Sequence, residues 1–110
     1  MKPKYGNIKT NGYDSKKEAA YAEKLDLLRS AEKSCERVVA IERQVKYELI
    51  PKQTIDGKCV ERACNYIADF RVVYANGRVD IIDVKGFKTP DYIIKRKLML
   101  HVFNIRVREV

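Results

Sequence analysis

The chain lacks several features that mark specialised classes of protein. No apolar run approaches the roughly 20 residues that a membrane-spanning helix needs. The N-terminus is polar and basic, and it has no apolar segment of the kind found in secretory signal peptides. We therefore expect a cytoplasmic protein without a membrane partner.

Cysteine and histidine are scarce. Cys35, Cys59 and Cys64 are an odd number and contain no Cys-x-x-Cys pair, which fits a reducing compartment better than a disulfide framework. His101 is the single histidine. A zinc site built from these four residues is therefore not expected.

Basic residues exceed acidic ones. The chain has 23 lysines and arginines against 15 aspartates and glutamates, which gives a formal net charge of +8. Such an excess favours polyanions as partners, nucleic acid first, although many basic domains of this size are charged only for solubility. A length of 110 residues with 45% hydrophobic residues predicts one folded domain with a modest core.

The N-terminal part predicts a basic arm followed by a helix. Residues 1–13 show little periodicity, so we expect an extended arm there and a single domain over residues 14–110. Ser15 and Glu18 match a capping box, with Asp14 as the alternative N-cap. The apolar stripe of this helix consists of Ala22, Leu25 and either Leu28 or Ala31, and the helix should end near residues 31–34.

Two interpretations of Glu18 remain open. The side chain either only closes the capping box, or it points toward a sheet and joins an acidic site, because it lies one helical turn before Ala22.

A long strand is predicted over residues 38–50, ending at Pro51. Its even positions are polar, which indicates either solvent or the floor of a nucleic-acid groove, with Gln44 as an auxiliary site residue. Residues 52–63 look like a polar, mobile loop with a turn at Asp56-Gly57.

The most informative stretch is a predicted hairpin, with strands over residues 66–74 and 78–85. It contains two carboxylates, Asp69 and Asp83, and one ammonium group, Lys85, among apolar residues. Charged side chains are rare on core strands unless they are paired or bind a metal. The hairpin is therefore the candidate site.

The length of the turn decides whether these groups can act together. A two-residue turn would place Asp69 and Asp83 on opposite faces of the sheet. A three-residue loop over residues 75–77, with Gly77 in the left-handed conformation of a G1 bulge, places them opposite each other. Lys85 then points to the same face, and a divalent cation would relieve the repulsion between the carboxylates. We predict the three-residue loop because only that register makes a site.

Simple ion pairs are the alternative for these charges. Asp69 would then pair with Arg71 or Lys85, and Asp83 would form a surface pair with Lys85.

A second helix and a last strand complete the chain. Thr89 is the expected N-cap and Pro90 the first helical residue of a helix over residues 91–103, and Asn104 should end it. Residues 105–110 alternate like an edge strand. The expected apolar stripe of the helix consists of Ile94, Leu98 and either His101 or Val102.

This order, with a glutamate on the first helix, an aspartate on the second strand and Asp-x-Lys on the third, resembles the PD-(D/E)XK nuclease superfamily. The likeness is closest to small phage-encoded nucleases, in the segments Ser15–Ala19, Tyr66–Phe70 and Asp83–Gly86. It extends more distantly to archaeal-type Holliday-junction resolvases. One departure is that Ala68, not proline, precedes Asp69.

The resemblance implies an α/β (α+β) fold with a restriction-endonuclease-like αβββαβ core, a mixed sheet flanked by two helices. It implies a metal-dependent DNA endonuclease, including structure-specific enzymes that resolve junctions in phage DNA recombination, replication or processing. Mg²⁺ or Mn²⁺ would be bound by Asp69, Asp83, the carbonyl of Val84 and Glu18. Lys85 would orient water or stabilise charge on the phosphate.

The expected partners are DNA, duplex or branched, and a second copy of the chain, because cutting both strands needs two active sites. The residues expected to contact DNA are Lys16, Lys17, Lys88, Lys95, Arg96 and Lys97. A nucleic-acid-binding module without catalysis, or a nuclease subunit that acts only beside a partner, remains the alternative.

Overall fold

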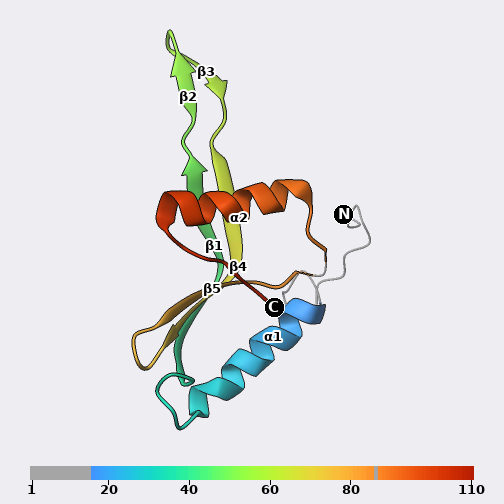
Figure 1. The fold of residues 1–110 in the computed structure, drawn as a ribbon, viewed down its shortest axis with the longest axis vertical. Coiled ribbons are helices and arrows are strands. Elements are labelled where there is room, and N and C mark those ends of the chain that lie inside the picture. The colour runs from blue at the N-terminus through green and yellow to red at the C-terminus, as the bar shows by residue number, and fades with distance from the viewer. Residues whose placement is uncertain (1–15, 86) are drawn as a thin grey trace. The chain divides into compact units, whose positions relative to one another are not determined.

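The computed structural model describes residues 16–85 and 87–110 (Figure 1). The elements are α1 (Lys16–Leu27), a 3-10 turn η1 (Leu28–Ser30), β1 (Val38–Ile50), β2 (Gln53–Ile55), β3 (Lys58–Glu61), β4 (Cys64–Tyr74), β5 (Val79–Asp83), α2 (Pro90–Phe103) and β6 (Arg108–Glu109). A four-stranded sheet has the order β1-β4-β5-β6, with β5 and β6 parallel, and β2 and β3 form a separate antiparallel pair. The predicted α+β class, with a mixed sheet and two helices, is confirmed.

The chain divides into two compact units, one comprising Met1–Ile41 and Val72–Val79 and the other Glu42–Arg71 and Asp80–Val110. That both units form one domain stays a prediction. Within the described residues, no helix has the length and apolarity needed to cross a membrane.

In the first unit, α1 buries the side that its apolar residues predict. Ala22 and Leu25 are buried, as is Ala19 one turn earlier. The helix ends at Leu27 and the 3-10 turn continues to Ser30, close to the predicted end. The basic arm and the N-caps proposed at positions 14 and 15 lie outside the described residues.

The strand β1 begins and ends at the predicted residues. Pro51 follows its last residue, because proline cannot donate to a strand ladder. Leu49 is buried, and the even positions from Glu42 to Glu48 are exposed, as the polar pattern indicates.

The polar connection after β1, predicted as a mobile loop, contains the strands β2 and β3, which pair as a hairpin. Its turn does fall at the predicted Asp56-Gly57, where both residues have positive φ, +50° and +78°. Such values are typical of the two-residue turns that join antiparallel strands. In Figure 1 the hairpin continues from the ends of β1 and β4.

The turn between β4 and β5 is the predicted three-residue loop. Gly77 N donates to Tyr74 O at 2.9 Å, and Tyr74 N donates to Arg78 O at 2.9 Å. Gly77 has φ +90°, which a residue with a Cβ rarely adopts. Counting along both strands from the Tyr74–Arg78 pair places Asp69 opposite Asp83.

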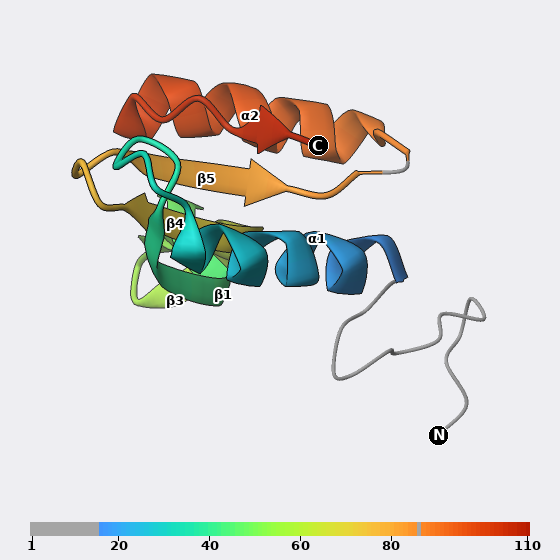
Figure 2. The same ribbon diagram turned by 90° about the horizontal axis from the view of Figure 1, so that it is seen from below.

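The second unit has a core between α2 and the sheet, and Figure 2 shows α2 running alongside β5. The buried members of this core are Leu49, Tyr66, Ala68, Ile81, Tyr92, Met99 and Val107. As predicted, Thr89 Oγ1 accepts from Tyr92 N at 3.4 Å at the start of α2. Asn104 ends the helix with φ +57°.

The predicted apolar stripe of α2 was right for Leu98, which packs against the core, and wrong for its other members. Ile94 and Val102 are 58% and 46% exposed, and the buried residues are Tyr92 and Met99. Apolar residues occur on several sides of this helix, so periodicity did not identify the inner face. The last strand is also shorter than predicted, since β6 comprises Arg108–Glu109, although Val110 N still donates to Asp83 O at 3.1 Å.

Candidate active site

Asp83 is the centre of the candidate site. It is the last residue of β5 and is 2% exposed. The hydroxyl of Tyr66 donates to its Oδ2. Its Oδ1 forms an ion pair with Lys85 Nζ at 3.5 Å and is buried without a hydrogen bond. A buried carboxylate oxygen without a hydrogen bond is uncommon in folded proteins, which makes Asp83 a candidate functional residue.

The electrostatic environment of Asp83 disfavours its charge. Burial raises the pKa of the Asp83 carboxyl, and the charge of Asp69 raises it further, against the lowering effects of Tyr66 and Lys85. Burial and the hydrogen bond with Asp83 raise the pKa of the Tyr66 phenol, so the phenol stays protonated and donates to Asp83. A cation at Asp83 would relieve this unfavourable balance.

Asp69 lies beside Asp83, as the predicted register requires. Its Oδ2 accepts from Val84 N at 2.8 Å, and its carboxyl is within hydrogen-bonding reach of Asp83. Tyr66 and Asp69 lie three positions apart in β4, and the burial of this strand alternates regularly from Tyr66 to Tyr74. Both side chains nevertheless reach Asp83.

Lys85 completes the predicted trio. Its ammonium group lies 4.5 Å from the centre of the Tyr92 ring in addition to its pair with Asp83. Because Asp83 is buried, this is not the simple surface ion pair of the alternative interpretation. Arg71, the other candidate partner for Asp69, binds Glu42 at 2.7 Å.

The ring that contacts Lys85 belongs to a second group of polar contacts, centred on Glu109, which the sequence did not predict. Tyr92 Oη donates to Glu109 Oε2 at 2.7 Å, and Arg96 Nη1 donates to the same oxygen at 3.1 Å. Lys88 Nζ lies 3.1 Å from Glu109 Oε1. The Tyr92 hydrogen bond, with Lys88 and Arg96, lowers the pKa of Glu109 to about 2, while burial raises that of Tyr92. The sequence does contain a signal for this group, because Glu109 is the single acidic residue among the basic residues of positions 105–110.

The remaining predicted residues are placed as follows. Glu18 is buried and belongs to the first unit, and its role at the site stays a prediction. Gln44 is exposed with φ +52°, and its auxiliary role is equally a prediction. Of the residues expected to contact DNA, Lys16, Lys17, Lys88 and Lys97 are exposed, and Lys95 and Arg96 are half-buried.

The donor set suits a hard cation. Across residues 16–85 and 87–110, no group of three or more His, Cys, Asp or Glu side chains is close enough to hold a metal. The protein ligands here would be Asp69, Asp83 and the main-chain carbonyl of Val84. These are oxygen donors, as Mg²⁺ and Mn²⁺ prefer, and Mg²⁺ commonly keeps several waters with only one or two carboxylates. The buried Oδ1 of Asp83, which makes no hydrogen bond, is an acceptor that such a cation could use.

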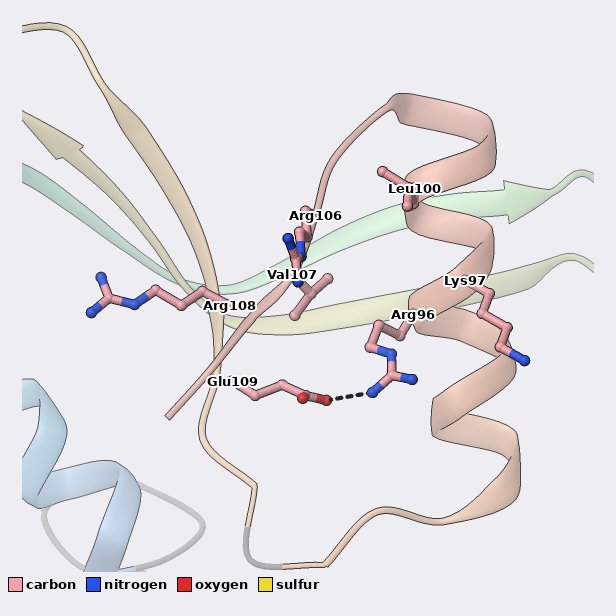
Figure 3. A pocket seen from close by; sticks show the side chains of 7 residues that line it. All are labelled: Arg96, Lys97, Leu100, Arg106, Val107, Arg108 and Glu109. Carbon is pink, nitrogen blue, oxygen red and sulfur yellow. Dashed lines mark hydrogen bonds and ion pairs between the residues drawn. The ribbon is translucent and has the colours of Figure 1, made fainter.

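Glu109 and Arg96 also line a basic pocket of about 680 Å³ between α2 and β6 (Figure 3). Its lining consists of Arg96, Lys97, Leu100, Arg106, Val107, Arg108 and Glu109. Glu109 is shared between the pocket and the Tyr92 contact, so the two features adjoin each other.

Fold and site together define a basic α+β protein with paired carboxylates on two neighbouring strands and a lysine just beyond one of them. A family model described as "Protein of unknown function (DUF1064)" matches residues 2–110, and the chain belongs to this family. No curated protein and no solved structure matches it.

Proposed function

We propose that the protein is a metal-dependent nuclease that hydrolyses phosphodiester bonds in DNA. The observation that carries the proposal is the meeting of Asp69 and Asp83 beside Lys85, with one buried Asp83 oxygen that makes no hydrogen bond. A Mg²⁺ or Mn²⁺ ion held by these carboxylates and the Val84 carbonyl would polarise a phosphate and lower the pKa of a bound water.

Lys85 supplies positive charge where a phosphate would gain negative charge. Its ammonium group is held between Asp83 and the ring of Tyr92, so it is oriented before a substrate arrives. Fixed charges of this kind stabilise a developing anion more than mobile ones do, because they need little reorganisation. Tyr66 holds Asp83 through its hydroxyl and thereby fixes the carboxylate's orientation.

DNA is the preferred substrate because the chain is strongly basic. Its net charge of +8 favours a polyanion over a small neutral substrate. Exposed Lys97 on α2 lines a pocket together with three arginines and adds positive charge there. Branched DNA, a nick and plain duplex all meet this requirement, so all three belong in the assay.

The experiment compares Asp83→Asn with the wild type on supercoiled plasmid, linear duplex and a four-way junction in Mg²⁺. Asparagine keeps an acceptor for Tyr66 but removes the charge. The variant should cut at least about 100-fold more slowly, the scale of losing one charged group at a reacting phosphate. Asp26→Asn is the matched control, since Asp26 is exposed and pairs only locally with Arg29. Equal cutting by the wild type and Asp83→Asn would refute the assignment.

The basic pocket also favours a second candidate, a nucleic-acid-binding module without catalysis. That function predicts binding that falls steeply with salt, with no cleavage and no affinity for Mn²⁺. Gel filtration of the free and DNA-bound protein tests the expected homodimer. The cleavage assay with the purified protein tests whether a further subunit is needed for activity.

A further inference from the structure

The pocket between α2 and β6 has the size and charge of a binding site. Its volume of about 680 Å³ lies in the range of roughly 300–1,000 Å³ typical of small-ligand sites. Four of its seven lining residues are basic and one is acidic. Clefts lined by one sign of charge focus the electric field and concentrate oppositely charged ligands.

The basic residues of the pocket fall into two kinds. Arg96 and Arg108 already contact carboxylates, Glu109 at 3.1 Å and Asp80 at 3.1 Å. Lys97 and Arg106 are exposed, and their side chains make no hydrogen bond or ion pair with any residue that the structure describes. The pocket therefore contains two cations whose charge no neighbouring carboxylate neutralises.

The chemistry of these two side chains suits a phosphate group. A guanidinium group can bind two phosphate oxygens at once, and an ammonium group adds a compact charge. Leu100, which is 51% exposed, and Val107 give the same pocket an apolar wall. A sugar or base can pack there while two phosphates of the same strand meet Lys97 and Arg106, whose side chains point away from each other (Figure 3).

We propose that this pocket binds two phosphates of a nucleic-acid strand, one at Lys97 and one at Arg106, at positions other than the bond that is cut. The inference rests on the proposed nucleic-acid substrate. Glu109 lies in the pocket lining and binds Tyr92, whose ring contacts Lys85, so a chain of side-chain contacts links the pocket to the carboxylate pair. The pocket thereby sets which phosphate reaches Asp69 and Asp83.

The test measures binding of a fluorescent 20-base-pair duplex by anisotropy in EDTA, where cleavage cannot occur. The variant Lys97→Ala/Arg106→Ala should bind at least 10-fold more weakly. It should also reduce the slope of log K against log salt by about two, one for each lost phosphate contact. The control Lys33→Ala/Arg29→Ala removes the same two residue types from exposed positions in the first unit and should leave both quantities within twofold.

Two results would overturn the inference: wild-type binding by the pocket variant, or an equal loss in pocket variant and control. Calorimetry with inorganic phosphate and with a deoxynucleoside monophosphate distinguishes the sources of the phosphate. Weak or absent binding of both supports a strand phosphate, and submillimolar binding of either would assign the pocket to a free anion instead. This test measures binding and no cleavage. If Asp83→Asn kept its activity, weaker DNA binding by the pocket variant would still support the pocket. If the pocket variant bound DNA like the wild type, a loss of activity in Asp83→Asn would still support the proposed function.

Discussion

Replacing Glu109 by glutamine should destabilise the protein at neutral pH and much less in acid. The carboxylate of Glu109 accepts from Tyr92 at 2.7 Å and from Arg96 at 3.1 Å, and it pairs with Lys88 at 3.1 Å. These contacts favour the charged form and lower its pKa from 4.5 to about 2. A carboxylate with a lowered pKa in the folded state contributes stability that is fully present above its unfolded pKa.

The size of the effect follows from the pKa change. At about 1.36 kcal/mol per pH unit, a fall from 4.5 to about 2 corresponds to at most about 3.4 kcal/mol. The Glu109 side chain is 23% exposed, so solvent screening reduces this contribution to about 1–2 kcal/mol. The contribution is lost as pH falls from about 4.5 through 2, and roughly two fifths of it remains at pH 3.

The assay is urea unfolding of the wild type and Glu109→Gln at pH 7, 5, 4 and 3. The difference in unfolding free energy should be about 1–2 kcal/mol at pH 7 and should shrink below half of that by pH 3. Glu23→Gln is the matched control, because Glu23 is exposed on α1 and has no ion pair among the described residues. A difference that stays constant with pH, or is absent at pH 7, would refute the reasoning.

Two further substitutions test the site and the turn that positions it. Tyr66→Phe leaves Oδ2 of buried Asp83 without its donor, so it should lower the free energy of unfolding by about 1–3 kcal/mol in urea titrations; a loss under about 0.3 kcal/mol would contradict the hydrogen bond. Gly77→Ala should cost about 1–2 kcal/mol through backbone strain alone, because Gly77 has φ +90° and an added Cβ would meet nothing within 4 Å. Unchanged stability of Gly77→Ala would mean that the turn does not hold the left-handed conformation in solution.

Local signals in the sequence predicted much of the fold. Pro51, Thr89 and Asn104 mark the ends of elements through properties of single residues, so their effects survive in the folded chain. The loop before Arg78 was predicted because only one turn length lets Asp69 and Asp83 share a side of the sheet. The pairing of Asp69 with Asp83 could therefore be predicted from the sequence.

What the sequence did not predict depends on packing between distant segments. All residues of β2 and β3 are exposed, so no alternation of apolar and polar residues marks the hairpin. The inner face of α2 is set by the contacts of Tyr92 and Met99 with the sheet, not by a unique stripe. The partnership of Tyr92 with Glu109 joins a helix to the last strand, and neither residue alone signals it.

Calorimetric titration with Mn²⁺ tests the central claim, that Asp69 and Asp83 together bind a divalent cation. The wild type should bind Mn²⁺, whereas Asp83→Asn should lose most of the binding heat and Asp26→Asn should keep it. Binding of Mn²⁺ by Asp83→Asn with the affinity of the wild type would contradict the account.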